Sequence, residues 1–246
     1  MKYFLFLFVL GSGCDDATLS PLEYDLTCPG EGDYAFADKV VQADGEVQAP
    51  SAINVQENAV NGVRGNKGSG SRDVLSRGYD KETKNNILIL EWEARTVQNV
   101  KGNDFVIFEN VFEVGVNNNF MDPIVVSVSN DLVNWSTFPF DYLAADEERY
   151  QPDPKLWMGF AGVNATNYNS DDSACLDPLD PISGGDAFDL DDLPEGSSHR
   201  AGFRYLKMQS APSIVNPDTN APFVRDFISD GFDLDGVYAK KVLPLN

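Results

Sequence analysis

The sequence predicts an all-β protein that folds as a single β-sandwich, or jelly roll, with long acidic loop inserts. From about residue 34 onward, short apolar runs alternate with turn residues, and long helical periodicity is missing. Residues 124–129 alternate with a period of two, which is typical of a strand with one apolar face. Hydrophobic residues make up 42% of the 246 residues, which is enough for the core of one domain over residues 34–246.

The expected strands follow one another along the chain with turn residues between them. They are residues 37–42, 87–94, 104–112, 124–129, 136–140, 203–209 and 236–242. Two inserts interrupt this series. Residues 62–73 are rich in Gly and Ser and locally basic, which predicts a flexible loop. Residues 143–197 are rich in Asp, Asn, Gly and Pro, and so long a connection is expected to be functional or to be ordered by something other than a core.

The first residues predict export and a lipid anchor. Residues 1–13 resemble a signal peptide, because Lys2 precedes an apolar run at 3–10 and small residues lead to Cys14. Small residues directly before a cysteine resemble a bacterial lipobox. We therefore expect Cys14 to carry lipid and to hold the protein at the bacterial cell envelope, on the outer membrane or cell surface. The alternative is an ordinary signal peptide with Cys14 in the mature chain. Residues 14–33 are expected to be a tether.

Two further cysteines, Cys28 and Cys175, are expected to form a disulfide, because an exported chain reaches an oxidising compartment. A bridge between such distant residues would stabilise the fold by about 4–5 kcal/mol in the chain-entropy model.

The charge balance excludes several function classes. Asp and Glu total 39 against 18 Lys and Arg, a formal net charge of −21. Nucleic-acid binding and docking on anionic lipid both need a basic face, so we expect membrane contact through the lipid anchor only. The single histidine, His199, excludes multi-histidine zinc sites and most histidine-based catalysis, and we expect it in a surface loop before a strand.

Three groups of carboxylates carry the most informative chemistry. They are Asp104 with Glu109, residues 184–192 and residues 230–236. Gathered carboxylates repel one another unless a cation neutralises them. Calcium takes about six to eight oxygen ligands and suits these groups, whereas the thiolates and imidazoles that transition metals prefer are nearly absent. The candidate calcium ligands from these groups are Glu109, Asp186, Asp189, Asp233 and Asp235.

The same acidic groups allow two alternatives to calcium. The acids could simply solvate loops, and none of the groups has the spacing of an EF-hand. Paired carboxylates also serve glycosidases as acid and nucleophile, so Glu109 with Asp233 or Asp235 would fit a polysaccharide hydrolase.

The tryptophans differ in their expected roles. Trp92 alternates with acids inside a strand, which favours the core, and Trp135 follows a turn that it is expected to staple. Trp157 lies in the long insert and is the best candidate for an exposed, ligand-binding aromatic, although insert aromatics also pin loops to the body of a protein.

Several blocks together resemble a largely uncharacterised family of bacterial cell-surface lipoproteins over about residues 34–240. The blocks are DFVIFEN at 104–110, GGDAFDL at 184–190 and GFDLDGV at 231–237. The turn at 127–131 with Trp135 is also similar to discoidin-like and carbohydrate-binding β-sandwiches of the galactose-binding-like type, with Leu132 where those have Gly.

The resemblance implies a surface location and a binding or scaffold role, without known catalysis. By likeness to the carbohydrate-binding sandwiches, Asp235 with Asp233 would share a structural calcium with Asp38 and Glu109. The resulting hypothesis is a calcium-stabilised envelope lipoprotein that binds a glycan or a protein partner. A polysaccharide hydrolase and a structural lipoprotein without a small ligand are the alternatives.

Overall fold

The computed structural model describes residues 35–45, 55–65, 71, 73–78, 86–171, 176–225 and 231–245. In this part of the chain the fold is all-β, as predicted, and every strand pairing within a sheet is antiparallel. The helices described are 3-10 turns of three or four residues. None of the described helices is long and apolar enough to cross a membrane.

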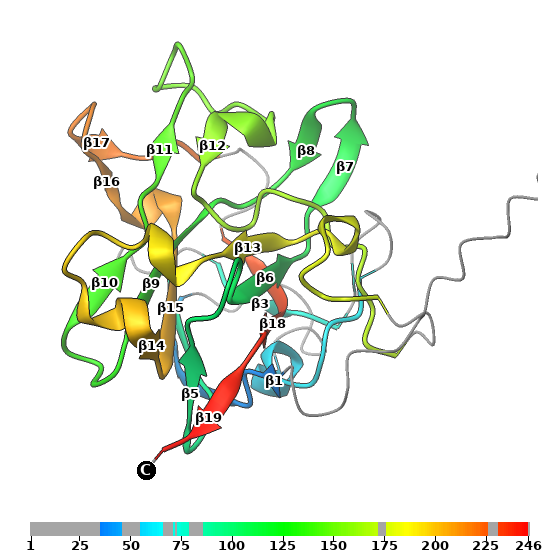
Figure 1. Ribbon diagram of the computed structural model, residues 1–246. Helices are drawn as coiled ribbons and strands as arrows, with labels where there is room; N and C mark the ends of the chain where they lie inside the picture. The colour runs from blue at the N-terminus through cyan, green and yellow to red at the C-terminus, as the bar shows by residue number, and fades with distance from the viewer. Residues whose placement is uncertain are drawn as a thin grey trace, which may run out of the picture.

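Two five-stranded sheets form the sandwich (Figure 1). The first has the order β1 (Ala35–Phe36), β18 (Asp233–Ala239), β6 (Phe105–Glu109) and β13 (Asp186–Phe188), with β3 (Leu75–Ser76) also paired to β18. The second has the order β10 (Trp135–Thr137), β9 (Ile124–Ser129), β15 (Tyr205–Ser210), β4 (Ile87–Glu91) and β2 (Lys39–Ala43).

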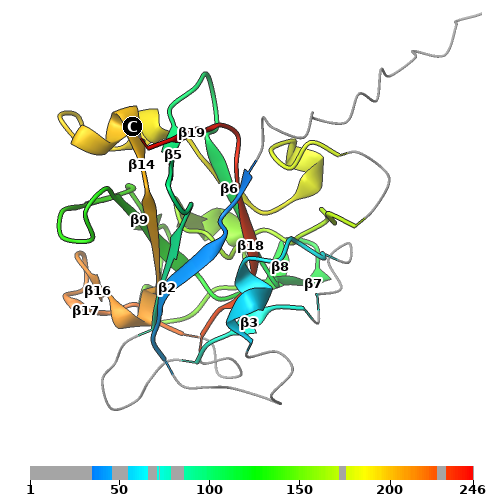
Figure 2. The ribbon, with the colours of Figure 1, turned by 90° about the horizontal axis from the view of Figure 1, so that it is seen from below.

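The main core lies between these two sheets. Ile107 and Val237 of the first sheet belong to the same buried cluster as Leu90, Val128 and Leu206 of the second. Figure 2 shows β6 and β18 on one side of this core and β9 and β2 on the other. Each sheet therefore buries one face against the other, as an amphipathic sheet must.

Smaller elements surround the sandwich. They are the sheet of β5 (Arg95–Gln98), β14 (Gly202–Phe203) and β19 (Val242–Pro244) and the hairpins β7 (Phe112–Gly115)–β8 (Asn118–Phe120), β11 (Asp141–Tyr142)–β12 (Trp157–Met158) and β16 (Val215–Asn216)–β17 (Ala221–Pro222). The 3-10 turns are η2 (Gln56–Ala59), η3 (Pro154–Leu156), η4 (Pro181–Ser183), η5 (Leu190–Asp192), η6 (Ser198–Ala201) and η7 (Ala211–Ser213).

The strand predictions hold best where the alternation is regular. Residues 124–129 form β9 with the predicted bounds. The predicted strand 203–209 is interrupted at Arg204, which separates β14 from β15. The last long strand begins at Asp233, earlier than predicted, because Asp233 and Leu234 pair with β3.

The described part of the long insert 143–197 has its own apolar cluster. Trp157, Phe160 and Val163 pack there with Tyr142 and Phe223. The insert also provides β13, which pairs with β6 at the edge of the first sheet. Of the two alternatives predicted for this insert, order without a core does not hold for its described part, and a functional role stays a prediction.

Several predictions fall outside the described residues. They concern the signal peptide 1–13, the tether 14–33, the lipid-bearing Cys14 and the disulfide between Cys28 and Cys175.

Candidate functional site

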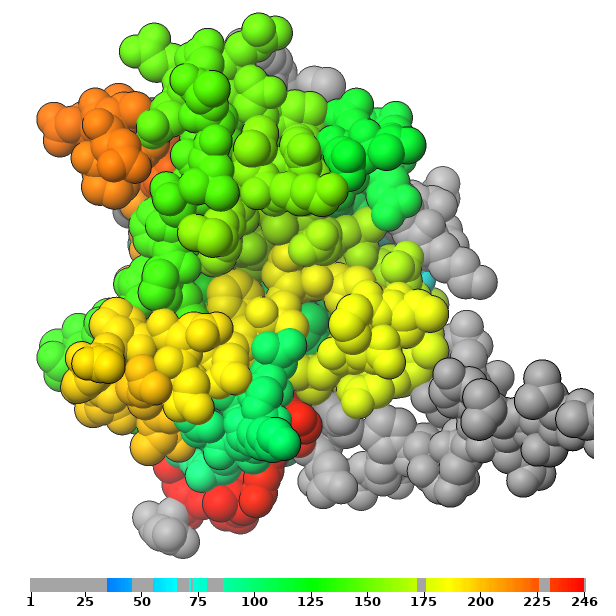
Figure 3. All heavy atoms as spheres, turned by 45° about the horizontal axis from the view of Figure 1, so that its top comes forward, coloured from blue at the N-terminus to red at the C-terminus, as the bar shows by residue number. Residues whose placement is uncertain are grey.

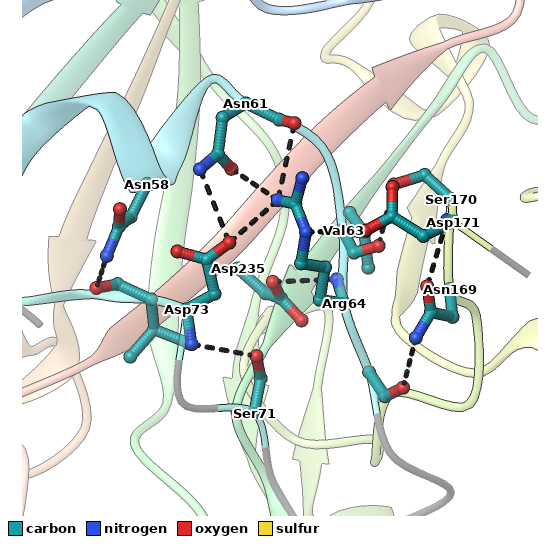
Figure 4. Close-up of polar contacts among 12 residues, drawn as sticks. Asn58, Asn61, Val63, Arg64, Ser71, Asp73, Asn169, Ser170, Asp171 and Asp235 are labelled. Atoms are coloured by element: carbon teal, nitrogen blue, oxygen red, sulfur yellow. Dashed lines mark hydrogen bonds and ion pairs between the residues drawn. The ribbon is translucent and has the colours of Figure 1, made fainter.

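Asp235 is buried beside an arginine (Figure 4). It lies at a β-bulge of β18, and its Oδ1 accepts a hydrogen bond of 3.0 Å from the backbone N–H of Arg64. The Arg64 guanidinium lies 2.7 Å from Asp73 Oδ2 and 2.8 Å from Asp171 Oδ2. Burial is the main cause that raises the pKa of Asp235 to about 7, and the charge of Arg64 opposes this rise. Arg64 therefore places one positive charge among three carboxylates and pairs through its guanidinium with Asp73 and Asp171.

Glu109 lacks such a cation among the described residues. Its side chain is 2% exposed, and Oε1 accepts a hydrogen bond of 2.8 Å from the backbone N–H of Asp233. Its Oε2 is buried and has no hydrogen-bond partner in the part of the chain that the structure describes. Burial raises the pKa of Glu109 well above its usual value, and the charges of Asp122 and Asp233 raise it further. This carboxyl group needs a proton or a cation.

Two of the other predicted ligands have structural partners. Asp38 accepts from the backbone N–H of Glu93 at 2.7 Å and forms an ion pair with Arg95. Asp189 caps η5 by accepting from the backbone N–H of Asp191 at 2.9 Å, which is a standard use of Asp at a helix N-terminus.

The structure therefore brings Glu109 and Asp233 together but places Asp38 and Asp235 in separate ion-paired groups. Glu109 lies opposite Leu234, whose side chain is in the main core, whereas Asp235 faces the loop of Arg64. Within the described ranges, no three His, Cys, Asp or Glu side chains are arranged to hold a metal ion.

Trp157 is not the exposed aromatic that the sequence predicts. It is 1% exposed, stacks on Tyr142 with ring centroids 4.0 Å apart, and donates from Nε1 to the backbone oxygen of Gln151 at 2.8 Å. Its large apolar ring fills the core of the insert, so Trp157 pins the insert to the body. Trp92 is buried and Trp135 donates to the oxygen of Leu132, as expected for a core residue and a turn staple.

His199 is buried, so its predicted surface position is also wrong. Its Nδ1 lies 2.8 Å from the Oγ of Ser136, and Ser197 Oγ lies 2.7 Å from the same hydroxyl. These bonds hold η6 against β10, because His199 and Ser136 belong to these two elements.

A further candidate site is a groove beside β13. Three cavities of about 760, 710 and 400 Å³ adjoin one another, and Asn164 lines all three. We call this feature the Asn164 groove. It runs from the β7–β8 hairpin past β12 and β13 to the turn at 178–181. Figure 3 shows this face, where the light-green segment meets the yellow one.

The sequence block GGDAFDL builds the floor of this groove. Gly184 and Gly185 have φ angles of 70° and 69°, which side chains rarely adopt, and a Cβ on Gly185 would lie 2.6 Å from the ring of Phe108. The glycines thus let β13 approach β6. Asp186 then accepts from the backbone N–H of Val163 at 3.1 Å and from Asn164 Nδ2 at 2.7 Å.

Asp186 thereby fixes the loop that carries Asn164. The carboxylate is buried, and burial raises its pKa to about 6 even though the hydrogen bonds from Val163 and Asn164 oppose the rise. Each oxygen accepts a hydrogen bond from these donors, so Asp186 positions the loop, and its predicted role as a metal ligand stays a prediction.

Three asparagine side chains in the groove use one of their two amide groups, the NH2 group or the carbonyl oxygen, in a hydrogen bond within the protein and leave the other available to a ligand. Asn164 donates to Asp186, and Asn167 donates to the oxygen of Ile182 at 3.2 Å, so each leaves its Oδ1 without a partner among the described residues. Asn117, at the turn of the β7–β8 hairpin, accepts from Lys155 Nζ at 3.1 Å and leaves its Nδ2 open within the same described ranges. These anchored amides are pre-organised hydrogen-bonding groups.

Sequence reasoning missed these amides and Arg64. Arg64 belongs to the segment 62–73 that the sequence predicts as a flexible loop, and two of its three acidic neighbours, Asp171 and Asp235, come from distant positions. The asparagines of residues 164–169 are visible in the sequence, but only the fold shows which amides are anchored.

Comparison with known proteins adds no assignment: no family model and no curated protein matches this chain.

Proposed function

We propose that this chain is a glycan-binding module of the bacterial cell envelope, held there by lipid on Cys14, with the Asn164 groove as its binding site. The observation that carries the proposal is the set of three anchored amides on Asn117, Asn164 and Asn167. Sugar hydroxyl groups both donate and accept hydrogen bonds, so they match two open carbonyl oxygens and one open NH2 group. The likeness to carbohydrate-binding sandwiches supports the same function.

The groove offers aliphatic rather than aromatic contact to a sugar. Met158 and Leu143, which line it, are 55% and 49% exposed, whereas the aromatic rings of Trp157 and Phe160 beside them are buried. Without an aromatic platform, a single module binds weakly. Many lipid-anchored copies on one surface would reach useful avidity by engaging one polymer together.

A glycan array with the mature protein tests this function, and two variants locate the site. Asn167→Ala removes an amide of the groove. Asn130→Ala is the matched control, because Asn130 also donates to a backbone oxygen at 3.2 Å but lies on the β9–β10 turn. We expect binding to be lost only in Asn167→Ala. A blank array together with a co-purifying protein would favour a protein partner or a structural lipoprotein instead.

The calcium part of the proposal concerns Glu109 and Asp233. Of the predicted ligands, Glu109 is the one with a buried oxygen that lacks both a donor and a nearby arginine among the described residues. Its oxygen chemistry fits calcium, which would neutralise the charge of the pair and stabilise the folded state. Asp235 also has an unpaired oxygen in the described part of the chain, but Arg64 already supplies a positive charge there.

Calcium should raise the melting temperature of the chelator-treated wild type and of Asp235→Asn, but not of Glu109→Gln. If Glu109 instead carries a proton, Glu109→Gln will be as stable as the wild type and calcium will leave all three proteins unchanged.

No observation favours the polysaccharide hydrolase. Glu109 and Asp235 are 2% and 0% exposed, and neither lines the Asn164 groove. Asp233, the other acid considered as a partner of Glu109, is partly exposed but does not line the groove either.

A further inference from the structure

We infer that the Asn164 groove selects glycans that carry hydroxyl or amino groups and no carboxylate or sulfate. This inference rests on the proposed glycan-binding function and narrows its ligand class. It follows from two independent properties of the groove, which are the distribution of its charges and the polarity of its open amides.

Carboxylates line the groove along its whole length. Glu113 lines the first and third cavities, Asp192 the second and Asp180 the third. All three side chains are exposed, and among the described residues none of them forms an ion pair. An anionic sugar in any of the cavities would therefore face a carboxylate, and like charges that meet in an interface weaken binding strongly.

Lys155 is the basic residue of the groove, and it does not reverse this charge. It lines the first two cavities, but its Nζ already donates to Asn117 Oδ1 at 3.1 Å. Glu113 lines the same first cavity. The net charge of −21 for the whole chain adds a long-range repulsion of polyanions, which salt screens.

Two of the three open amide groups favour the same ligands, whereas the third, Asn117 Nδ2, is a donor that bonds to a hydroxyl oxygen as readily as to a carboxylate. Asn164 and Asn167 offer carbonyl oxygens, which accept hydrogen bonds and need donors on the ligand. Hydroxyl and ammonium groups are donors, whereas an ionised carboxylate or sulfate can only accept. The carboxylate of a uronic acid would therefore bring a hydrogen-bond acceptor to the carbonyl oxygens of Asn164 and Asn167. It would also bring a negative charge to the carboxylates of the groove.

The test compares oligosaccharides of equal length and linkage that are neutral, amino-substituted or uronic. With the mature protein at low salt, we expect titration calorimetry to show binding of the neutral or amino forms and at least about tenfold weaker binding of the uronate form. Binding of a neutral form should change little with salt, whereas a tighter amino form should weaken as salt is added.

A double variant separates charge from shape. Glu113→Gln with Asp192→Asn removes two exposed carboxylates of the groove and keeps side-chain size. We expect this variant to gain affinity for the uronate form, so that the ratio of its uronate affinity to its neutral affinity rises above that of the wild type.

The outcomes distinguish the two proposals. Uronate binding as tight as neutral binding in the wild type would overturn the inference and leave the glycan-binding function standing. An unchanged uronate affinity in the double variant would also overturn it. If no glycan of any charge binds, the proposed function itself fails.

Discussion

Leu132 lies in a turn at a backbone angle that is strained for a residue with a side chain, and this strain lowers the stability of the fold. Its φ of 64° lies in the left-handed region, which glycine adopts more readily than residues with a side chain. The turn holds because Leu132 donates to Ser129 Oγ at 3.0 Å and Asp131 accepts from the backbone N–H groups of Val133 and Asn134. The bonds to Asp131 favour its ionised form and lower its pKa.

We expect Leu132→Gly to raise the free energy of unfolding by about 0.5 kcal/mol, because glycine adopts this φ without steric cost. The matched control is Val133→Gly, because Val133 is the neighbour of Leu132 and is 77% exposed. This substitution should lower the free energy of unfolding by about 0.5–1 kcal/mol. Urea unfolding measures both, and equal effects of the two substitutions would contradict the argument.

Arg64 supplies the positive charge near Asp235 that the sequence assigns to a metal ion. Arg64→Met removes the guanidinium from Asp73 and Asp171 but keeps the backbone N–H to Asp235. We expect a loss of about 1–3 kcal/mol in the free energy of unfolding, measured in urea. Arg64→Lys keeps the charge without the planar fork and should recover only part of this loss. A fully stable Arg64→Met would mean that solvent or a cation neutralises the acids.

At the scale of elements, β13 is a strand that the sequence alone does not predict. Its three residues are too few to show an alternating pattern, and both its first residue, Asp186, and the residue that follows the strand, Asp189, are acidic. Pairing with β6 makes them a strand, which is a tertiary effect. The regular strand β9 needs no such help, and its alternation alone predicts its bounds. The block GGDAFDL does mark a structurally important segment, and its Asp186 positions the loop that carries Asn164, a role that the sequence alone does not predict.

The approach of β13 to β6 depends on Gly185. Gly185→Ala would bring a Cβ to 2.6 Å from Phe108 and 2.8 Å from the oxygen of Ile107, so β13 must shift. We expect a loss of about 2 kcal/mol or more and weaker glycan binding. Gly196→Ala is the control, since Gly196 also has a positive φ, of 84°, but nothing among the described residues lies near its Cβ position.

Thermal melting measures the loss of stability, and titration with a glycan that the wild type binds measures the loss of affinity. If Gly196→Ala is as harmful as Gly185→Ala, the backbone angle alone accounts for the loss, and the close approach of the strands does not matter.

At the scale of the whole molecule, buried acids set the dependence of stability on pH. Burial raises the pKa of Asp104 to about 6, of Asp186 to about 6 and of Asp235 to about 7. The folded state thus binds more protons than the unfolded state between about pH 4 and 7, so stability is lost as pH rises through the folded pKa values.

We expect the melting temperature in chelator to be about 5 °C or more higher at pH 5 than at pH 8. Asp235→Asn should reduce this difference, because its amide does not titrate. A melting temperature that rises from pH 5 to pH 8 would contradict the assignment of these groups.

The strand order of the first sheet also constrains when the protein can fold. Strand β18 comes from the end of the described chain, yet it pairs with β1 from the beginning and with β6 from the middle. The sheet cannot close before almost the whole chain is available, and such distant pairings form slowly. For a chain that we propose to be exported, this delay is useful: it stays unfolded during synthesis and completes its sandwich only after translocation.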